Sequence, residues 1–236
     1  MKNKLIVVTG ATKGIGRAIA EKFAGENFDI VVCARNREDL NLMKEKFKQD
    51  FPAVTVYVMQ ADMARKDQVI EFGNFVNDLG REVSILVNNA GYFLPGQISN
   101  EPDGTLESMV QTNVFGAYHL TRCLLPAMMK HKKGYIFNMG STASITPYVN
   151  GGSYCISKFA LLGFSKVLRE EMKAFGVKVT TILPGATLTD SWEGTDLPTA
   201  RFIKPGDVAD IIYHTYTLSP NSVVEEILVR PQLGDI

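Results

Sequence analysis

Residues 5–16 read Leu-Ile-Val-Val-Thr-Gly-Ala-Thr-Lys-Gly-Ile-Gly, a short apolar run that leads directly into a glycine cluster. The apolar run predicts a strand that is buried on both faces, and the residues that follow have helical spacing. Gly10 permits a tight turn, and Gly14 and Gly16 let the backbone approach a pyrophosphate. A plain turn would also use glycines. The position between a first strand and a helix, whose N-terminus attracts anions, favours a nucleotide-binding loop with GxxxGxG spacing.

Apolar runs and amphipathic stretches alternate along the rest of the chain. The predicted strands are 5–9, 30–34, 55–59, 84–88, 135–139, 178–183 and 227–230, and the predicted helices are 14–26, 37–49, 65–79, 103–132, 153–175 and 205–218. The strands are apolar at nearly every position, which is typical of a parallel sheet covered by helices on both faces. No linker or repeat interrupts the pattern. We therefore predict one doubly wound α/β domain of the Rossmann type over residues 1–236.

Composition excludes several classes of protein. The 236 residues include 25 Lys and Arg and 25 Asp and Glu, so the charge balance indicates no nucleic-acid or membrane partner. No apolar run is long enough for a signal peptide or a membrane span. The three cysteines are widely spaced, which favours packing roles in a reduced, cytoplasmic protein over a disulfide framework or a metal site.

The end of the second predicted strand discriminates between cofactors. An NAD site places an acid there to bind the ribose hydroxyls, whereas residues 33–37 of this chain read Cys-Ala-Arg-Asn-Arg. Arg35 can fork onto the 2′-phosphate of NADP(H), and Lys13 offers a second counter-charge. A solvated helix start is the alternative for Arg35. Asp62 either binds the adenine amino group or caps the next helix.

Tyr154 and Lys158 are four residues apart near the start of a helix, so they share one face. A nearby ammonium lowers the pKa of a tyrosine, which can then act as a general acid or base at a carbonyl. Ser141 ends the fifth strand and could hydrogen-bond a substrate oxygen, although a turn residue is the alternative. Asn113 lies mid-helix, where asparagine is unfavourable. This placement predicts a local kink with a buried water, or else a capping or surface role.

The motifs together resemble the short-chain dehydrogenase/reductases, in their shorter single-domain branch. The matching residues are TGATKGIG at 9–16, Asp62, NNAG at 88–91, Asn113, Ser141, YCISK at 154–158, and Pro184-Gly185 followed by Thr189. The resemblance implies a parallel sheet in the order 3-2-1-4-5-6-7. It also implies that Tyr154 is the proton donor, that Lys158 lowers its pKa and holds the nicotinamide ribose, that Ser141 orients the carbonyl and that Asn113 holds a relay water.

The same resemblance implies an NADP(H) site preferred over NAD(H). Its residues are Gly10, Thr12, Lys13, Gly14, Ile15, Gly16, Arg35, Asp62, Met63, Asn89, Ala90, Gly91, Tyr154, Lys158, Pro184, Gly185, Thr187 and Thr189. Thr187 replaces a usually apolar residue, which is tolerable if the backbone makes that contact. Members of the family commonly pair two long helices, here 103–132 and 153–175, so we expect a homodimer or homotetramer.

Two loops, 90–103 and 185–204, follow strand ends and are candidates for the substrate site. Tyr92, Phe93, Leu94, Ile145, Tyr148 and Trp192 are the apolar and aromatic residues there or in the adjoining loop, and packing is the alternative for each. They indicate a moderately apolar ketone, aldehyde or 3-oxoacyl substrate. A sugar-nucleotide epimerase or dehydratase would tend to have GxxGxxG spacing and a larger C-terminal domain. A non-catalytic, cofactor-sensing scaffold would be expected to lose Tyr154 or Lys158.

Overall fold

The first strand, β1 (Leu5–Thr9), is buried along its whole length and lies in the middle of the sheet. Its side chains alternate, with Ile6 and Val8 in one hydrophobic core and Leu5 and Val7 in the other. This two-sided burial explains why its sequence is continuously apolar. The computed structural model describes residues 3–236. No helix within those residues is both long enough and apolar enough to cross a membrane.

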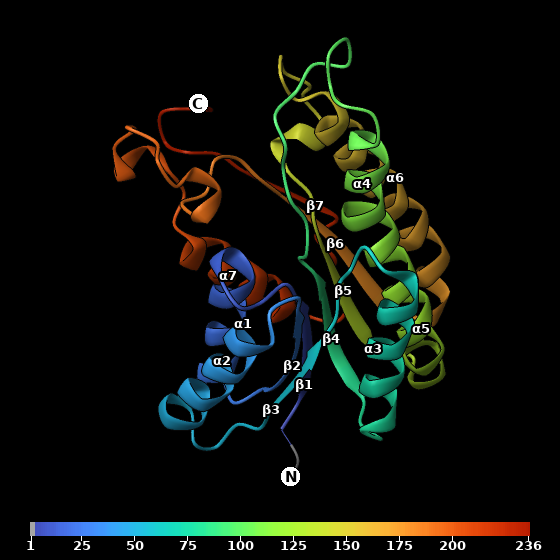
Figure 1. Cartoon of the computed structure of the whole chain (residues 1–236). Helices are drawn as coiled ribbons and strands as arrows, with labels where there is room; N and C mark the ends of the chain where they lie inside the picture. Colours follow the sequence, from blue (N-terminus) through green and yellow to red (C-terminus); the bar gives the residue numbers. More distant parts are fainter. Residues whose placement is uncertain (1–2) are drawn as a thin grey trace.

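Within the described residues, seven strands form one parallel sheet in the order β3-β2-β1-β4-β5-β6-β7, as predicted (Figure 1). The other strands are β2 (Asp29–Ala34), β3 (Val56–Gln60), β4 (Val83–Asn88), β5 (Gly134–Met139), β6 (Val177–Pro184) and β7 (Glu226–Val229). Neighbouring strands are aligned so that Thr9 lies opposite Cys33. The chain leaves β1 towards β2 and β3, then returns to place β4 on the other side. Sheets of this kind bind ligands at such a point of reversal, which here lies at the carboxyl ends of β1 and β4 and is called the crevice.

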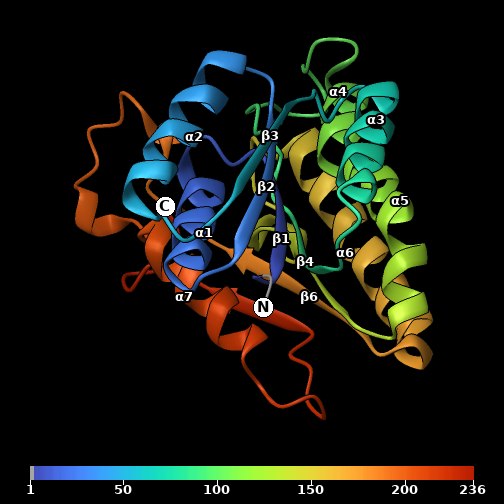
Figure 2. The ribbon, with the colours of Figure 1, turned by 90° about the horizontal axis from the view of Figure 1, so that it is seen from below.

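Helices cover both faces of the sheet, as Figure 2 shows from below. One layer contains α1 (Gly14–Gly25), α2 (Arg37–Asp50) and α7 (Pro205–Tyr216). The opposite layer contains α3 (Lys66–Asp78), α4 (Thr105–Val110), α5 (Gly116–His131) and α6 (Gly152–Met172). The arrangement is a doubly wound α/β domain, which confirms the predicted fold class.

The predicted helix 103–132 is wrong in one respect, because it is not continuous. The segment Gln111–Phe115 is π-helical and separates α4 from α5. Asn113 lies in this π-helical turn, so the predicted local kink is present at the predicted residue. A π-helical turn redirects the backbone, and here it turns the Asn113 side chain into the crevice rather than along the helix surface.

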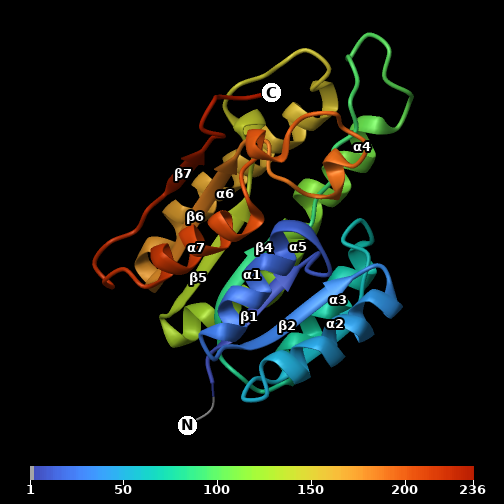
Figure 3. The same cartoon turned by 90° about the vertical axis from the view of Figure 1, so that its left-hand side faces the viewer.

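A buried ion pair closes the amino-terminal edge of the sheet. Asp29 accepts a hydrogen bond from the Thr55 backbone N–H at 2.7 Å, and its other carboxylate oxygen contacts the Arg81 guanidinium. Both charged side chains are about nine-tenths buried. The loops at the opposite, carboxyl edge include 92–101 in green and 186–204 in orange, and both reach beyond the sheet in Figure 3. The buried ion pair therefore lies at the amino-terminal edge of the sheet, whereas the loops of the candidate site lie at the carboxyl edge.

Candidate active site

Hydrogen bonds join the glycine-rich loop to the residues at the end of β4. The Thr9 hydroxyl accepts hydrogen bonds from the backbone N–H groups of Asn89 at 3.0 Å and Ala90 at 2.9 Å. In return the Asn89 amide donates to the Thr9 carbonyl at 2.9 Å and to the Gly10 carbonyl at 3.0 Å. The role of Thr9 was missed in the sequence, since a threonine at the end of an apolar strand has no distinctive local signal.

The surroundings of Gly16 show how closely the glycine-rich loop packs against Asn89. A Cβ atom on Gly16 would lie 2.4 Å from the Asn89 amide nitrogen and 2.5 Å from the Gly10 carbonyl oxygen. Gly10 has a φ of +63° and makes the turn from strand to helix. Lys13, the residue that precedes α1, makes no side-chain cap, and the first turn of α1 contains no acidic residue. The residues present therefore fit a dinucleotide phosphate, with helix N–H groups, Thr12, Gly14 and Ile15 at the entrance.

The candidate 2′-phosphate residues lie on the surface beside this loop. Arg35 is exposed just beyond β2, and its backbone carbonyl accepts a hydrogen bond from the Gln60 side chain at 2.8 Å. Lys13 forms an ion pair of 2.8 Å with Asp190, a residue of the 186–204 segment. The structure thus places Lys13 between two elements, the glycine-rich loop and this segment, which sequence analysis did not anticipate.

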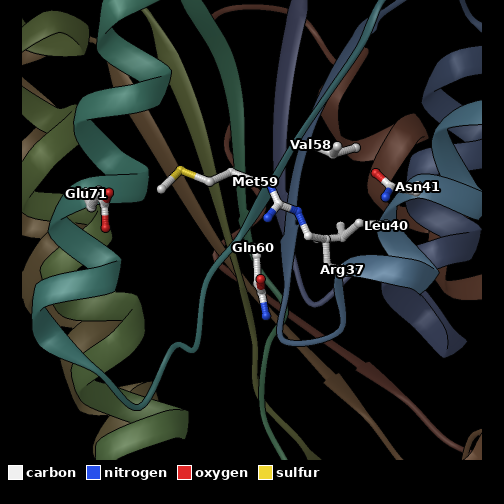
Figure 4. A pocket seen from close by; sticks show the side chains of 7 residues that line it. All are labelled: Arg37, Leu40, Asn41, Val58, Met59, Gln60 and Glu71. Atoms are coloured by element: carbon white, nitrogen blue, oxygen red, sulfur yellow. The ribbon is translucent and has the colours of Figure 1, made fainter.

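A hollow of about 340 Å³ lies further along the edge strand β3 (Figure 4). Its lining residues are Arg37, Leu40, Asn41, Val58, Met59, Gln60 and Glu71. Gln60 connects it to the backbone of Arg35, but it includes none of the predicted catalytic residues. The hollow is therefore a surface feature beside Arg35, separate from the predicted catalytic residues.

Asp62 and Met63 follow β3 at the carboxyl edge of the sheet. The Asp62 carboxylate accepts a hydrogen bond from the Ala64 backbone N–H at 2.9 Å, so it supports the turn before α3. Its backbone N–H donates to Gln68 at 2.8 Å. Met63 is buried and lies 3.7 Å, sulfur to sulfur, from Cys33. Asp62 does not cap α3, because the helix begins after Arg65 and has no side-chain cap, so the capping alternative is wrong and the carboxylate supports the preceding turn with one oxygen.

Lys158 is buried on the first turns of α6, with 5% of its surface exposed. Its ammonium donates to the Met139 carbonyl at 2.8 Å and lies 5.7 Å from the centre of the Tyr154 ring. Burial lowers the pKa of this ammonium to about 8. The end of β5 and the start of α6 therefore hold a cation of unusually low basicity beside the tyrosine.

Burial dominates the pKa of the Tyr154 hydroxyl, and the lowering by Lys158 that the family resemblance implies stays a prediction. Burial raises the pKa of Tyr154 above the ordinary value, and the hydrogen bond with Ser141 lowers it by a smaller amount. The ammonium of Lys158 interacts with the Met139 carbonyl instead of the hydroxyl. In the structure Tyr154 is accordingly a protonated group, suited to give up a proton.

Ser141 has the turn role that was one of its two predicted alternatives, and its hydrogen bond to a substrate oxygen stays a prediction. Its hydroxyl accepts a hydrogen bond from the Ala143 backbone N–H at 3.1 Å and so caps the short 3-10 helix Thr142–Ser144. The same hydroxyl lies close enough to the Tyr154 hydroxyl to lower its pKa. The capping bond fixes the orientation of the serine, so that its hydroxyl stays directed at the reacting group.

Asn113 is buried, with 1% of its surface exposed, so the surface alternative is wrong. Its side-chain oxygen accepts from the Tyr92 backbone N–H at 3.0 Å, and its amide donates to the Tyr92 carbonyl at 3.1 Å and to the Ser157 hydroxyl at 3.0 Å. The amide therefore joins α6 to the chain that follows β4. Gly91 lies between it and Lys158, because a Cβ there would be 3.0 Å from the Asn113 oxygen and 3.5 Å from the lysine nitrogen.

A second buried hydrogen-bond network lies within the sheet and helices next to the catalytic residues. The Asn88 amide donates to Asn138 at 2.8 Å and to the Thr121 hydroxyl at 3.0 Å, and the Asn138 amide donates to Ser165 at 2.8 Å. These bonds connect β4 and β5 with α5 and α6. Asn138 was missed in the sequence, since one polar residue inside an apolar strand gives no indication of its partners.

The residues after β6 lie over the glycine-rich loop. Gly185, next to Pro184, donates its N–H to the Val229 carbonyl at 2.8 Å. Thr187 is buried, and its hydroxyl donates to the Gly185 carbonyl at 3.0 Å, so its side chain is turned towards its own backbone. Thr189 lies against Gly14, where an added Cβ would come within 3.2 Å of the threonine methyl carbon. The segment 186–204 thus contacts the glycine-rich loop, through Thr189 against Gly14 and through the ion pair of Asp190 with Lys13.

Apolar side chains surround the opening of the crevice. The Phe93 ring meets the Tyr154 ring edge to face, with the ring centres 4.9 Å apart. Ile145 and Tyr148 are exposed, and burial of the hydroxyl still raises the pKa of Tyr148. Trp192 packs edge to face on Phe202 at 5.0 Å. The Tyr92 hydroxyl instead donates to the Ser108 hydroxyl on α4 at 2.7 Å.

Known proteins are similar to this chain in sequence and in fold. The family model described as short chain dehydrogenase matches residues 4–198. An uncharacterized oxidoreductase of Staphylococcus epidermidis is 31% identical over 231 residues, which are 98% of each chain. A sepiapterin reductase of Chlorobaculum tepidum is 30% identical over 238 residues, with 98% of each chain covered. The crystal structure of L-sorbose reductase from Gluconobacter frateurii, complexed with NADPH and L-sorbose, has a TM-score of 0.90 at 29% identity and covers 98% of this chain and 96% of its own.

Proposed function

Because the chain belongs to the short-chain dehydrogenase family, we propose that it is an NADP(H)-dependent oxidoreductase that reduces a ketone, aldehyde or 3-oxoacyl group to an alcohol. The observation that carries this proposal is the convergence of Ser141, Tyr154 and Lys158 at the carboxyl end of β5. The glycine-rich loop, which fits a dinucleotide, lies at the same edge of the sheet.

The preference for NADP(H) over NAD(H) is supported by charge. Arg35 is exposed at the end of β2, where an NAD site would carry an acid, and Lys13 lies in the glycine-rich loop. Both cations suit the 2′-phosphate of the cofactor. The similar L-sorbose reductase was crystallised with NADPH, which agrees with this assignment.

The bound cofactor would supply the hydride to the carbonyl carbon. Tyr154 gives its hydroxyl proton to the carbonyl oxygen as the C–H bond forms, so the product is a neutral alcohol. Its raised pKa keeps that proton in place at neutral pH before the reaction. The Ser141 hydroxyl hydrogen-bonds the same oxygen and steadies the charge that develops there.

Lys158 and Asn113 act behind the tyrosine. The buried ammonium of Lys158 stabilises the phenolate that remains after proton transfer, because opposite charges interact strongly where water is excluded. Asn113 fixes the approach of α6 to the residues after β4. A water held by Asn113 near this π-helical turn would link Lys158 to solvent, and a proton could return to Tyr154 along this path.

The opening of the crevice favours a moderately apolar substrate. Phe93 packs on the Tyr154 ring, and Ile145 and Tyr148 in the loop after β5 expose further apolar surface. Such surface contributes about 25 cal/mol for each Å² that a ligand buries. A panel of ketones of increasing apolar size should therefore show rising kcat/KM, and exclusive turnover of a charged sugar nucleotide would contradict this substrate class.

We also propose a homodimer or homotetramer formed through α5 and α6. Tyr118 on α5 and Ile156, Phe159 and Val167 on α6 leave large apolar side chains exposed. Burying such a face between two copies removes it from water. Light scattering should give more than one chain per particle for the wild type and a shift towards the monomer for Phe159→Glu, whereas a monomeric wild type would contradict the assembly.

The cofactor site is tested by titrating NADPH and NADH into the wild type, Arg35→Asp and Arg37→Asp. Trp192 is the single tryptophan of the chain and reports on the 186–204 segment. Arg35→Asp should weaken NADPH binding about 10- to 100-fold, the value of one or two charge-assisted hydrogen bonds, and leave NADH binding nearly unchanged. Arg37→Asp is the matched control. Tighter binding of NADH, with no effect of Arg35→Asp, would overturn the assignment.

A further inference from the structure

Residues 92–101, here called the substrate-side loop, are attached to the start of α6 at several points. The Gly96 N–H donates to the Asn150 carbonyl at 2.9 Å, and the Gly152 N–H donates to the Gly96 carbonyl at 3.1 Å. The Gln97 amide donates to the Asn150 side chain at 3.0 Å. These bonds hold the loop beside the turn that carries Tyr154.

Glu101 makes the attachment nearest to the reacting group. One carboxylate oxygen accepts from the Ser153 backbone N–H at 2.9 Å, and the other accepts from the Ser153 hydroxyl. Ser153 is buried, with 2% of its surface exposed, and directly precedes Tyr154. Gly151, at the cap position of α6, has no side chain to serve this purpose. Glu101 therefore caps the catalytic helix from a different part of the chain.

Two glycines leave the space that this carboxylate occupies. A Cβ on Gly96 would lie 2.5 Å from the Glu101 Cγ, and a Cβ on Gly152 would lie 2.4 Å from a Glu101 carboxylate oxygen. Real Cβ atoms do not approach so closely without displacing their neighbours. The side chain of Glu101 is thus enclosed by backbone on both sides, which restricts it to one place at the end of α6.

The loop that Glu101 anchors also packs on Tyr154. Phe93 belongs to the same loop, and its ring meets the Tyr154 ring at 4.9 Å with an interplanar angle of 71°. We propose that Glu101 is a positioning residue for carbonyl reduction, which fixes both the first turn of α6 and the Phe93 wall against Tyr154. This inference rests on the proposed function, since it concerns the same tyrosine.

The negative charge of Glu101 adds an effect that a neutral cap would not have. The titratable groups facing Tyr154 are Lys158 and Cys155 on α6 and Tyr148 in the adjoining loop. A carboxylate at the amino end of α6 offsets the positive end of the helix dipole, which by itself favours an anion such as the phenolate near the first turn. Removing that charge should lower this pKa and shift the high-pH limb of the reduction profile towards acid.

Three variants separate the hydrogen bond from the charge. Glu101→Gln keeps an acceptor for Ser153 but loses the charge, whereas Glu101→Ala loses both. Asp103→Asn is the matched control, because Asp103 is an exposed acid two residues further along the chain. Each protein is assayed for NADPH binding, for kcat and KM with the ketone that the wild type reduces best, and for the pH profile.

We expect Glu101→Ala to lower kcat/KM about 10- to 100-fold, as small displacements of reacting groups do, with NADPH binding within about 2-fold of the wild type. Glu101→Gln should keep kcat within about 3-fold and move the high-pH limb by about 0.3 pH unit to lower pH. Asp103→Asn should match the wild type. If Glu101→Ala lowers only the melting temperature, and its kcat/KM and pH limb match those of Asp103→Asn, the positioning role is overturned.

Hydrogen–deuterium exchange tests the anchoring without turnover. Segments 92–101 and 150–158 should exchange faster in Glu101→Ala than in Glu101→Gln or Asp103→Asn, and equal exchange in all variants would overturn the inference. A wild type that binds NADPH but reduces no carbonyl counts against the proposed function instead. The two failures are therefore distinguishable.

Discussion

The floor of the site and its opening differ in how completely each residue is held. On the floor, Thr9, Asn113 and Lys158 are at most 5% exposed and have hydrogen-bond partners on other elements of the fold. Around the opening, Phe93 and Tyr148 are 39% and 47% exposed and make few contacts. The floor is determined by the sheet and helices beneath it, whereas the opening is determined by contacts between loops. Substitutions on the floor should therefore cost much more than those around the opening.

The largest effect is expected for Tyr154→Phe, which removes one hydroxyl from the floor and keeps the ring that packs on Phe93. Loss of the proton donor should lower kcat about 1,000-fold, within the usual range for general acid catalysis. Steady-state reduction with NADPH measures it. NADPH binding and the melting temperature should remain close to those of the wild type. A variant with more than a tenth of the wild-type kcat would show that another group donates the proton.

The second prediction concerns the packing of the floor. Gly16→Ala places a methyl group against the Asn89 amide and the Gly10 carbonyl, so we expect about 3 kcal/mol lower stability and strongly weakened NADPH binding. Gly206→Ala is the matched control, because nothing lies within 4 Å of a Cβ on that residue of α7. The control should gain up to about 1 kcal/mol from helix propensity. Urea unfolding curves measure the stability of both variants. Equal stabilities of Gly16→Ala and Gly206→Ala would mean that the glycine-rich loop and Asn89 adjust to the added methyl group without loss of stability.

The floor and the opening also differ in how well the sequence predicted them. All seven strands were found to within one residue at either end. Burial on both faces makes the central strands mostly apolar, and the partly exposed edge strands β3 and β7 still consist mainly of apolar residues. Thr9 and Asn138 could not be assigned partners, since their contacts join strands to distant segments. Glu101 was missed for the same reason. Its partner Ser153 is 52 residues away, and a glutamate between Asn100 and Pro102 looks like any solvated loop residue.

The third prediction uses the buried charge of Lys158. The folded-state pKa of about 8 lies below the ordinary 10.5, so the folded protein pays a penalty for the ammonium below pH 8. This penalty is relieved as the pH rises from 8 to 10.5. Lys158→Met should abolish reduction but stabilise the fold by about 2 kcal/mol at pH 7, after allowing for the bond lost to Met139.

Urea unfolding at pH 7 and at about pH 9.5 checks this sign. The advantage of Lys158→Met over the wild type should shrink at the higher pH, because the wild type then holds the lysine neutral. Lys166→Met serves as the control, since Lys166 is exposed on the same helix. A variant that is less stable than the wild type at both pH values would show that the Met139 hydrogen bond outweighs the buried charge.

The smallest effect is expected around the opening, at the ion pair of Lys13 and Asp190. Both side chains are more than half exposed, so the pair contributes little to stability, about 0.5 kcal/mol or less. If Lys13 binds the 2′-phosphate, Asp190 competes with that phosphate for the same ammonium. Asp190→Asn should then tighten NADPH binding about 2-fold, leave NADH binding unchanged and lose its effect at high salt, where exposed charges are screened. Asp196→Asn, in the same exposed segment, controls for net charge. Weaker NADPH binding in Asp190→Asn alone would mean that the ion pair holds segment 186–204 closed over the cofactor, and that the opening is more rigid than its exposure implies.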